Sequence, residues 1–90
     1  MNRLEWLILM LEEKNIDLKQ LGGRMRHIRL NSHFAVAHLS FMYDIPITTI
    51  IDYESGKVFP PKKAFKAMSS LSKGRYRSLD DILNSFSKDA

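Results

Sequence analysis

Cysteine is absent from this chain of 90 residues, which excludes disulfide bonds and thiolate metal sites. Long apolar runs are absent too: the longest, WLILML at residues 6–11, is far shorter than the roughly 20 residues that span a bilayer. Glu5 before that run and EEK at residues 12–14 after it are untypical of a signal peptide. We therefore expect a soluble, cytoplasmic protein that has no membrane partner.

Strand-like alternation of apolar and polar residues is also missing, as are repeats and low-complexity tracts. Hydrophobic residues make up 44% of the chain and charged residues 27%, which suits one compact domain and leaves no room for a second core. Lys and Arg number 14 against 10 Asp and Glu, and the resulting net charge of +4 favours a polyanionic partner. We predict a single all-α domain.

Residue patterns for catalysis or metal binding are missing as well. His27, His33 and His38 are the only imidazoles, and their spacing does not put consecutive members on one helical face, as a zinc pair requires. Asp80 and Asp81 are better explained as acidic residues that oppose the dipole at a helix start. No glycine-rich phosphate-binding motif occurs. We expect no enzyme activity, no cofactor and no metal.

The first segment, residues 1–16, is predicted to form an amphipathic helix. Apolar residues recur at helical spacing along one side, and three more widen the apolar arc: Trp6, Leu9 and Met10. Two interpretations stay open for this arc. It packs against its own domain, or part of it forms an interface with a partner.

Five further helices are predicted for the main domain, residues 17–86, ahead of a frayed polar tail at residues 87–90. Asp17 and Ser78 suit the N-caps of the first and last of these helices. The approximate limits follow from the apolar spacing and from Gly and Pro, and they are 17–30, 34–42, 46–55, 61–73 and 78–86.

Two of these helices, 34–42 and 46–55, are short and are separated by about three residues. A helix of about two turns is unstable alone, so the first helix must brace the second. Pro46 fits the first turn of the second helix because that position needs no amide donor. This arrangement is a helix-turn-helix.

Residues 21–83 resemble the lambda-repressor-like, Cro/CI-type (Xre) helix-turn-helix family. The order and the gaps of several anchors fit the family pattern, although each anchor alone is unspecific. The anchors are LGGRMRHIR at residues 21–29, Phe34, Leu39, Ile45, Ile50, YESGK at 53–57, Pro60 and SLDDIL at 78–83. The resemblance implies a compact five-helix lambda-repressor-like domain, to which the N-terminal amphipathic helix is an addition.

The resemblance also assigns roles to individual residues. It implies that residues 46–54 form a recognition helix in the major groove of double-stranded DNA. It implies an ion pair between Arg29 and Glu54, which ties the first helix of the domain to the end of the recognition helix. The implied base-reading residues are Ile47, Thr48, Thr49 and Asp52, and the implied phosphate contacts lie around Arg29, Ser55 and Lys57.

Further basic residues flank the predicted recognition helix. They can hold phosphates in a salt-dependent way that is largely blind to sequence, and they are Arg24, Arg26, Lys57, Lys62 and Lys63. The alternative is an ordinary solvated charged surface. GRYR at residues 74–77 offers another aromatic and basic contact, or is only a loop that holds two helices apart.

Three positions depart from the family pattern. Ala35 and Val36 stand where the family has a capping Ser and a phosphate-binding Gln, and Asp44 replaces the Gly of the turn. Asp adopts the left-handed conformation at modest cost, so the turn is retained, whereas the cap and one phosphate contact are lost. The predicted reading set also lacks Arg, Gln and Asn, which make the bidentate contacts to bases.

Two functions stay open. The first is a DNA-binding transcriptional regulator of bacterial or phage origin, which binds its operator as a repressor-type homodimer because one short reading helix binds too loosely alone. The candidate dimer interface is formed by Trp6, Leu9, Met10, Ile82 and Phe86.

The second function keeps the fold but recognises another protein, as an antirepressor or a regulator of a transcription factor does. Val36, Ile47 and Ile51 motivate it, because together they form an apolar patch if they are exposed. Exposure of Val36 beside an unpaired Asp52 would favour a protein partner. A continuous positive surface around the recognition helix would favour DNA.

Overall fold

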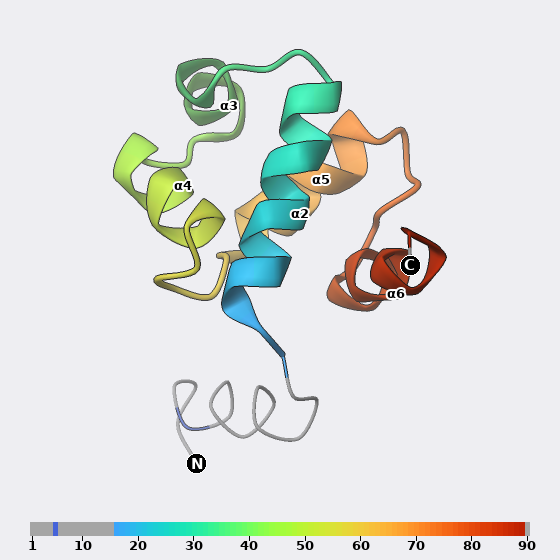
Figure 1. The fold of residues 1–90 in the computed structure, drawn as a ribbon. Helices are drawn as coiled ribbons and strands as arrows, with labels where there is room; N and C mark the ends of the chain where they lie inside the picture. Colours follow the sequence, from blue (N-terminus) through green and yellow to red (C-terminus); the bar gives the residue numbers. More distant parts are fainter. Residues whose placement is uncertain (1–4, 6–15, 90) are drawn as a thin grey trace.

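The computed structural model describes residue 5 and residues 16–89 of the chain, with side chains as far as residue 84. Over residues 16–89 the chain consists of helices joined by turns and loops, without a strand. Figure 1 shows α2 in the middle, with α3 and α4 on one side of it and α6 on the other. The prediction of a compact all-α domain is confirmed for these residues. The helices are α2 (Leu18–Asn31), α3 (Val36–Tyr43), α4 (Ile47–Glu54), α5 (Lys62–Leu71) and α6 (Leu79–Asp89).

The two ends of the chain compare differently with prediction. The predicted N-terminal helix lies almost entirely outside the described residues. At the other end, α6 continues to Asp89, so the frayed tail predicted from residue 87 is wrong up to that point. The sequence SFSKD at residues 85–89 contains no Gly or Pro that would end a helix.

Backbone conformation in the loops sets where α3 begins and where α5 ends. α3 begins at Val36, later than predicted, because His33 has a φ of 62° and Ala35 is extended. Ala35 is the N-cap residue of α3 and forms no side-chain cap, as predicted, because its methyl group cannot accept a hydrogen bond. α5 ends at Leu71, which agrees with a helix that ends by Gly74, and the chain turns through Lys73 with a φ of 55°.

α2 is the helix around which the others are arranged. The Asp17 carboxylate caps it by accepting hydrogen bonds from the backbone amides of Lys19 at 2.9 Å and Gln20 at 3.3 Å, which confirms the predicted N-cap. Gly22 lets α4 approach very closely, since a Cβ at that position would collide with the backbone carbonyl oxygens of Tyr53 and Glu54. The close approach explains a glycine in the first half of a central helix.

The core is formed by the inward faces of all five helices. It contains two small residues of α5, Ala64 and Ala67, and α5 packs against both α2 and α3. α6 packs against α2 and contributes Ile82, which is fully buried. Ile82 is therefore unavailable to a dimer surface, and that part of the prediction is wrong. The buried core residues are Leu21, Met25, Ile28, Leu39, Ile45, Ile50, Tyr53, Ala64, Ala67, Met68 and Ile82.

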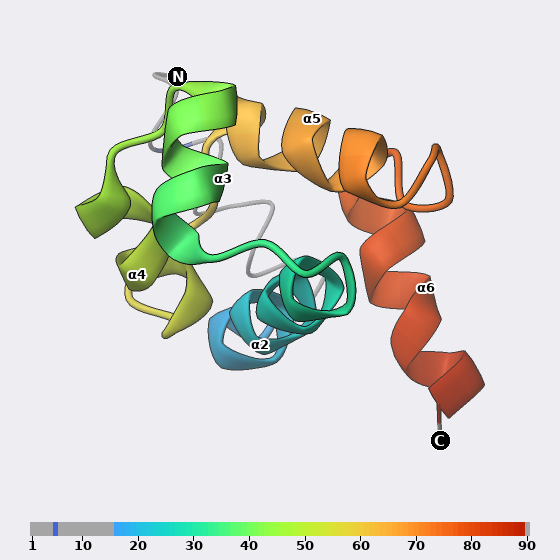
Figure 2. The ribbon, with the colours of Figure 1, turned by 90° about the horizontal axis from the view of Figure 1, so that it is seen from above.

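A tight turn at Asp44 joins α3 to α4. Asp44 has a φ of 54° and a ψ of 50°, the left-handed conformation that Asp adopts more readily than most residues. Lys63 of α5 holds this turn by donating to the backbone oxygen of Asp44 at 3.2 Å and to its carboxylate at 3.1 Å. Ile45 follows and is buried, and Figure 2 shows α3 beside both α4 and α5. The predicted pair of short helices joined by a tight turn is confirmed.

Candidate nucleic-acid interface

α4 has an inner face in the core and an outer arc toward solvent. Ile50 and Tyr53 are fully buried, whereas Ile47 and Ile51 are 46% and 51% exposed. Because residues four apart lie on the same side of a helix, Ile47 and Ile51 stand one above the other. Thr48 is exposed beside them.

The predicted base-reading residues are divided between this arc and its edge. Ile47 and Thr48 are exposed, Asp52 is half-buried at the border of the arc, and Thr49 is half-buried toward the core. Ile51 was not among the predicted base-reading residues, although its position four residues after Ile47 indicates the same face. The outer arc of α4 therefore consists of Ile47, Ile51, Thr48 and Asp52, and we use that name for these four residues.

The carboxylate of Asp52 has no hydrogen-bond or ion-pair partner among the described residues, although its backbone is well used. Its carbonyl oxygen accepts from the Ser55 hydroxyl at 3.0 Å and from the Lys57 amide at 2.9 Å. Ser55 and Lys57 are both exposed at the end of α4. The carboxylate of Asp52 is thus a hydrogen-bond acceptor that remains available to a ligand within the described residues.

Arg29 and Glu54 form the predicted ion pair, and their side chains are only 6% and 7% exposed. Nε of Arg29 donates to Glu54 at 2.8 Å and Nη2 donates at 3.0 Å, while Nη1 donates to the carbonyl of Phe34 at 2.7 Å. The hydrogen bond with Glu54 raises the pKa of Arg29, against the opposing effect of burial. The predicted phosphate contact of Arg29 is wrong, because its buried guanidinium donates to protein acceptors from every nitrogen.

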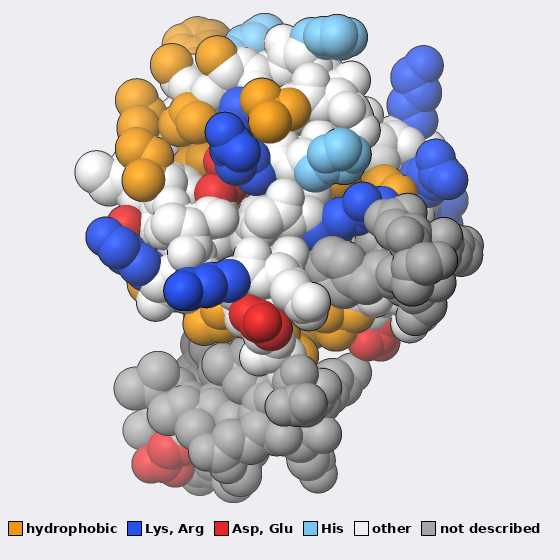
Figure 3. Space-filling model, in the orientation of Figure 1, with side chains coloured by type: hydrophobic (Ala, Val, Ile, Leu, Met, Phe, Trp, Pro, Cys, Tyr) orange, Lys and Arg blue, Asp and Glu red, His pale blue; other side chains and the backbone are white. Residues whose placement is uncertain are grey.

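The other predicted phosphate contacts on the α4 side of the molecule are mostly accessible. Arg26 is exposed and lines a shallow groove together with Val36, Ile51 and Ser55. Lys57 and Lys62 are exposed as well, whereas Lys63 is committed to Asp44 while keeping 57% of its side chain in solvent. Figure 3 shows Lys and Arg side chains around the hydrophobic surface over α3 and α4, one of them between two groups of hydrophobic atoms.

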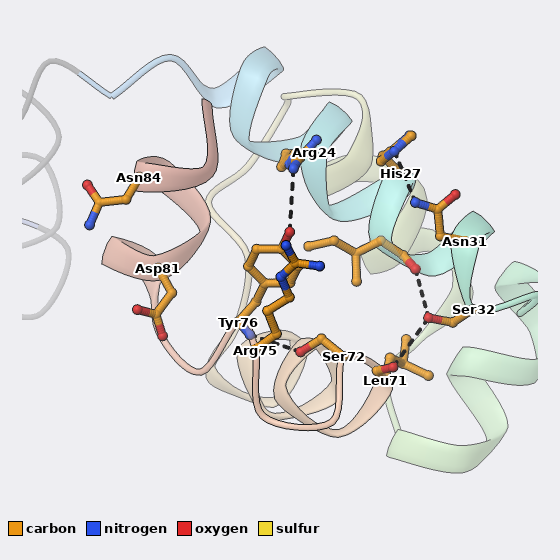
Figure 4. A pocket seen from close by; sticks show the side chains of 11 residues that line it. Arg24, His27, Asn31, Ser32, Leu71, Ser72, Arg75, Tyr76, Asp81 and Asn84 are labelled. Atoms are coloured by element: carbon orange, nitrogen blue, oxygen red, sulfur yellow. Dashed lines mark hydrogen bonds between the residues drawn. The ribbon is translucent and has the colours of Figure 1, made fainter. Parts of the chain in front are cut away.

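Arg24 lies elsewhere, on the face of α2 that is turned toward α6. Its Nη2 is 3.5 Å from the hydroxyl of Tyr76, and its guanidinium carbon is 6.0 Å from the centre of that ring. Arg75 lies 5.7 Å from the same ring centre, and Figure 4 shows these side chains in a cavity bordered by α2, the loop after α5 and α6. The predicted role of Arg24 beside the recognition helix is therefore wrong, and GRYR holds the loop against α2.

Hydrophobic side chains are exposed on α3 next to the outer arc. Phe41 is 86% exposed and Met42 is 54% exposed, and Figure 3 shows hydrophobic atoms gathered over α3 and α4. We call Phe41, Met42, Ile47 and Ile51 the α3–α4 apolar patch. The sequence analysis did not identify Phe41 as exposed. Its position two residues after the buried Leu39 indicates the opposite side of the helix.

Several predictions lie outside what the structure describes. Among the candidate dimer residues, Trp6, Leu9, Met10 and the side chain of Phe86 fall there. Within the described residues, no helix has the length and apolar composition needed to cross a bilayer, and no cluster of three or more His, Asp or Glu is placed to hold a metal. Comparison with protein-family models, with characterised proteins and with solved structures finds no match for this chain.

Proposed function

We propose that this protein is a DNA-binding transcriptional regulator of the lambda-repressor-like type, in which α4 enters the major groove. The observation that carries the proposal is the outer arc of α4, which stands free of the core at the end of a braced two-helix unit. The major groove is about 12 Å wide and admits a single helix. The order of the helices and the turn at Asp44 agree with this role.

Three contacts support the proposal by holding α4 rigidly. Gly22 lets the helix approach α2, the pair of Arg29 with Glu54 anchors its last turn, and Lys63 holds the turn before its first residue. Rigid presentation matters because a base-reading side chain that is displaced by about 1 Å loses its contact geometry. A helix of eight residues gains this rigidity only from its neighbours.

Phosphate binding would come from the exposed cations around the arc. Arg26 lies on one side of it at the groove, Lys57 follows α4, and Lys62 begins α5. Such contacts release counterions, so they give affinity that falls with salt and carries little sequence information. The net charge of +4 acts in the same direction.

A homodimer is part of the proposal. One α4 with few polar readers gives too little discrimination against the many competing sites, whereas two copies double the contacts across half-sites about one turn of the duplex apart. With Ile82 in the core, the dimer surface is assigned to the N-terminal segment with Trp6, Leu9 and Met10, together with Phe86. Regulation through an operator then follows from occupancy of a dyad-symmetric site.

A second candidate, recognition of another protein, is favoured by one specific observation. Phe41 and Met42 extend the apolar surface beyond α4, where a phosphate backbone would gain nothing from them. Val36 is half-buried and contributes less than the sequence suggested. A protein partner would cover the α3–α4 apolar patch and place a donor against Asp52.

The experiment is selection from random-sequence duplexes and from the DNA upstream of its own gene, followed by affinity measurements at two salt concentrations. Arg26→Ala should weaken all sequences and lower the salt slope by about one. Arg75→Ala removes the same charge on the far side of α2 and serves as the matched control, with no change expected. Thr48→Ala should alter the sequence preference.

DNA binding is contradicted if no sequence is enriched and the salt dependence stays shallow. In that case the protein-binding candidate is tested by Phe41→Ser, which should abolish capture of the partner without unfolding the domain, because Phe41 is 86% exposed.

A further inference from the structure

We infer that α4 recognises A·T base pairs through the 5-methyl groups of thymine, which Ile47 and Ile51 contact in the major groove. This inference rests on the proposed DNA binding and deepens it by naming the chemistry that is read. It also adds Ile51 to the specificity-determining residues.

The exposed side chains of α4 offer few other ways to recognise a base. Its outer arc holds two isoleucines, one threonine and one aspartate, and it lacks Arg, Lys, Asn and Gln. The bidentate hydrogen bonds that identify guanine or adenine are therefore unavailable to it. The feature of the major groove that an aliphatic side chain does distinguish is the methyl group of thymine.

The geometry of the two isoleucines suits a pair of methyl groups. They lie one turn apart on one side of α4, and half of each side chain is exposed. Four residues of helix rise by about 6 Å, and two base-pair steps of one strand rise by about 6.8 Å. For a helix that lies along the groove, Ile47 and Ile51 therefore face methyl groups two steps apart.

Asp52 adds a second constraint, because its carboxylate accepts hydrogen bonds and is repelled by other acceptors. Its carboxylate has no partner among the described residues, and it borders the isoleucines on the outer arc. Guanine presents only acceptors in the major groove, at N7 and O6, so a carboxylate is repelled there. Adenine at N6 and cytosine at N4 both present an amino donor to Asp52, so Asp52 alone does not separate A·T from G·C pairs, and only the A·T pair adds a methyl group for the isoleucines.

Burial of these exposed side chains sets the expected size of the effect. Each methyl group removed from water against an isoleucine contributes about fourfold in affinity, so that two contribute roughly fifteenfold. Thr48 adds a hydroxyl and a methyl of its own without changing this argument. Sequence preference then depends on a single substituent of one base.

The test compares two duplexes of about two helical turns, one of alternating dA and dT and the other of alternating dA and dU, which lacks only the methyl groups. Affinities are measured by fluorescence anisotropy at fixed low salt. The thymine duplex should bind roughly fifteenfold more tightly than the uracil duplex. A second pair, with cytosine or 5-methylcytosine opposite guanine, should show a gain when the methyl group is added.

Variants separate direct contact from the effect of methyl groups on DNA stiffness. The double substitution Ile47→Ala and Ile51→Ala should remove the preference for thymine over uracil while keeping the salt slope. Phe41→Ala removes a more exposed hydrophobic side chain from α3 and should leave the preference intact. Circular dichroism confirms that each variant is folded.

Three outcomes would overturn the inference. Equal, salt-dependent binding of the thymine and uracil duplexes overturns methyl reading but leaves DNA binding in place. A preference that persists in the double alanine variant assigns the effect to DNA stiffness. Absence of binding to any duplex at low salt overturns both the inference and the proposed function.

Discussion

Arg29 in α2 and Glu54 at the end of α4 are joined by two parallel hydrogen bonds of 2.8 Å and 3.0 Å. Both side chains are more than nine-tenths buried. The pair therefore links the central helix α2 to α4, whose outer arc is exposed. Whatever binds the arc depends on this link for the position of α4.

We predict that Glu54→Gln lowers the free energy of unfolding by about 3 kcal/mol, because it leaves the buried guanidinium of Arg29 without a counter-charge. Urea denaturation followed by circular dichroism measures the change. The double substitution Arg29→Met and Glu54→Leu removes both charges together and should recover most of the loss. A loss below about 1 kcal/mol in Glu54→Gln would mean that the pair behaves like an exposed one.

Gly22 and Gly23 form a natural pair of test and control. Gly22→Ala should lower the free energy of unfolding by about 2 kcal/mol or more, because its Cβ meets backbone oxygens of α4 that cannot rotate away. Gly23→Ala meets nothing within 4 Å and should stabilise α2 by roughly 0.5–1 kcal/mol. Thermal denaturation of both variants checks the order. If Gly22→Ala stabilised the fold as Gly23→Ala is expected to do, the close approach of α4 to α2 would be contradicted.

Tyr53 is fully buried, and its hydroxyl has no hydrogen-bond partner among the residues that the structure describes. Tyr53→Phe removes a polar atom that loses its hydration on folding and keeps the ring that fills the core. We predict an unchanged or higher free energy of unfolding, by up to about 1 kcal/mol. Tyr43→Phe, at a half-buried position, is the control. A clear loss of stability in Tyr53→Phe would show that the hydroxyl has a partner after all.

Alkaline pH should weaken the fold through the same side chain. Burial raises the pKa of Tyr53, so the folded protein keeps this proton while the unfolded chain releases it near pH 10. The free energy of unfolding is therefore unaffected by this proton below pH 10, and it falls as the pH rises above 10, because only the unfolded chain then gains by releasing the proton. Between pH 9 and pH 11 the parent should lose about 1 kcal/mol more than Tyr53→Phe does. Parallel pH curves for the two proteins would contradict this.

Local signals accounted for most of the helix starts. Asp17 carries the side chain that an N-cap needs, Ser78 accepts from the amide of Asp81 at 3.3 Å, and Pro46 precedes α4 directly. Each acts within about three residues of its own position, so the sequence contains the whole interaction. The later start of α3 is different, because it depends on the conformation of the loop at His33.

Arg24 and Arg26 show where such local signals end. The two residues are two positions apart on α2, and a helix points such neighbours to nearly opposite sides. Arg26 reaches the groove beside α4, and Arg24 reaches Tyr76 beside α6. The spacing separates the two faces, but only the packing of α4 and α6 against α2 tells which face meets which helix.

By itself, the sequence determined the helical class, the short helix pair with its left-handed Asp44, and an α4 whose predicted base-reading residues lack Arg, Gln and Asn. These features follow from side-chain chemistry and helical period, which act over a few residues. Only the tertiary structure decided that Ile82 is core and that Phe41 is exposed, although both are large and apolar. The resemblance implied the pair of Arg29 with Glu54, but only the tertiary structure showed that both side chains are buried, because burial depends on which helices meet and not on residue type.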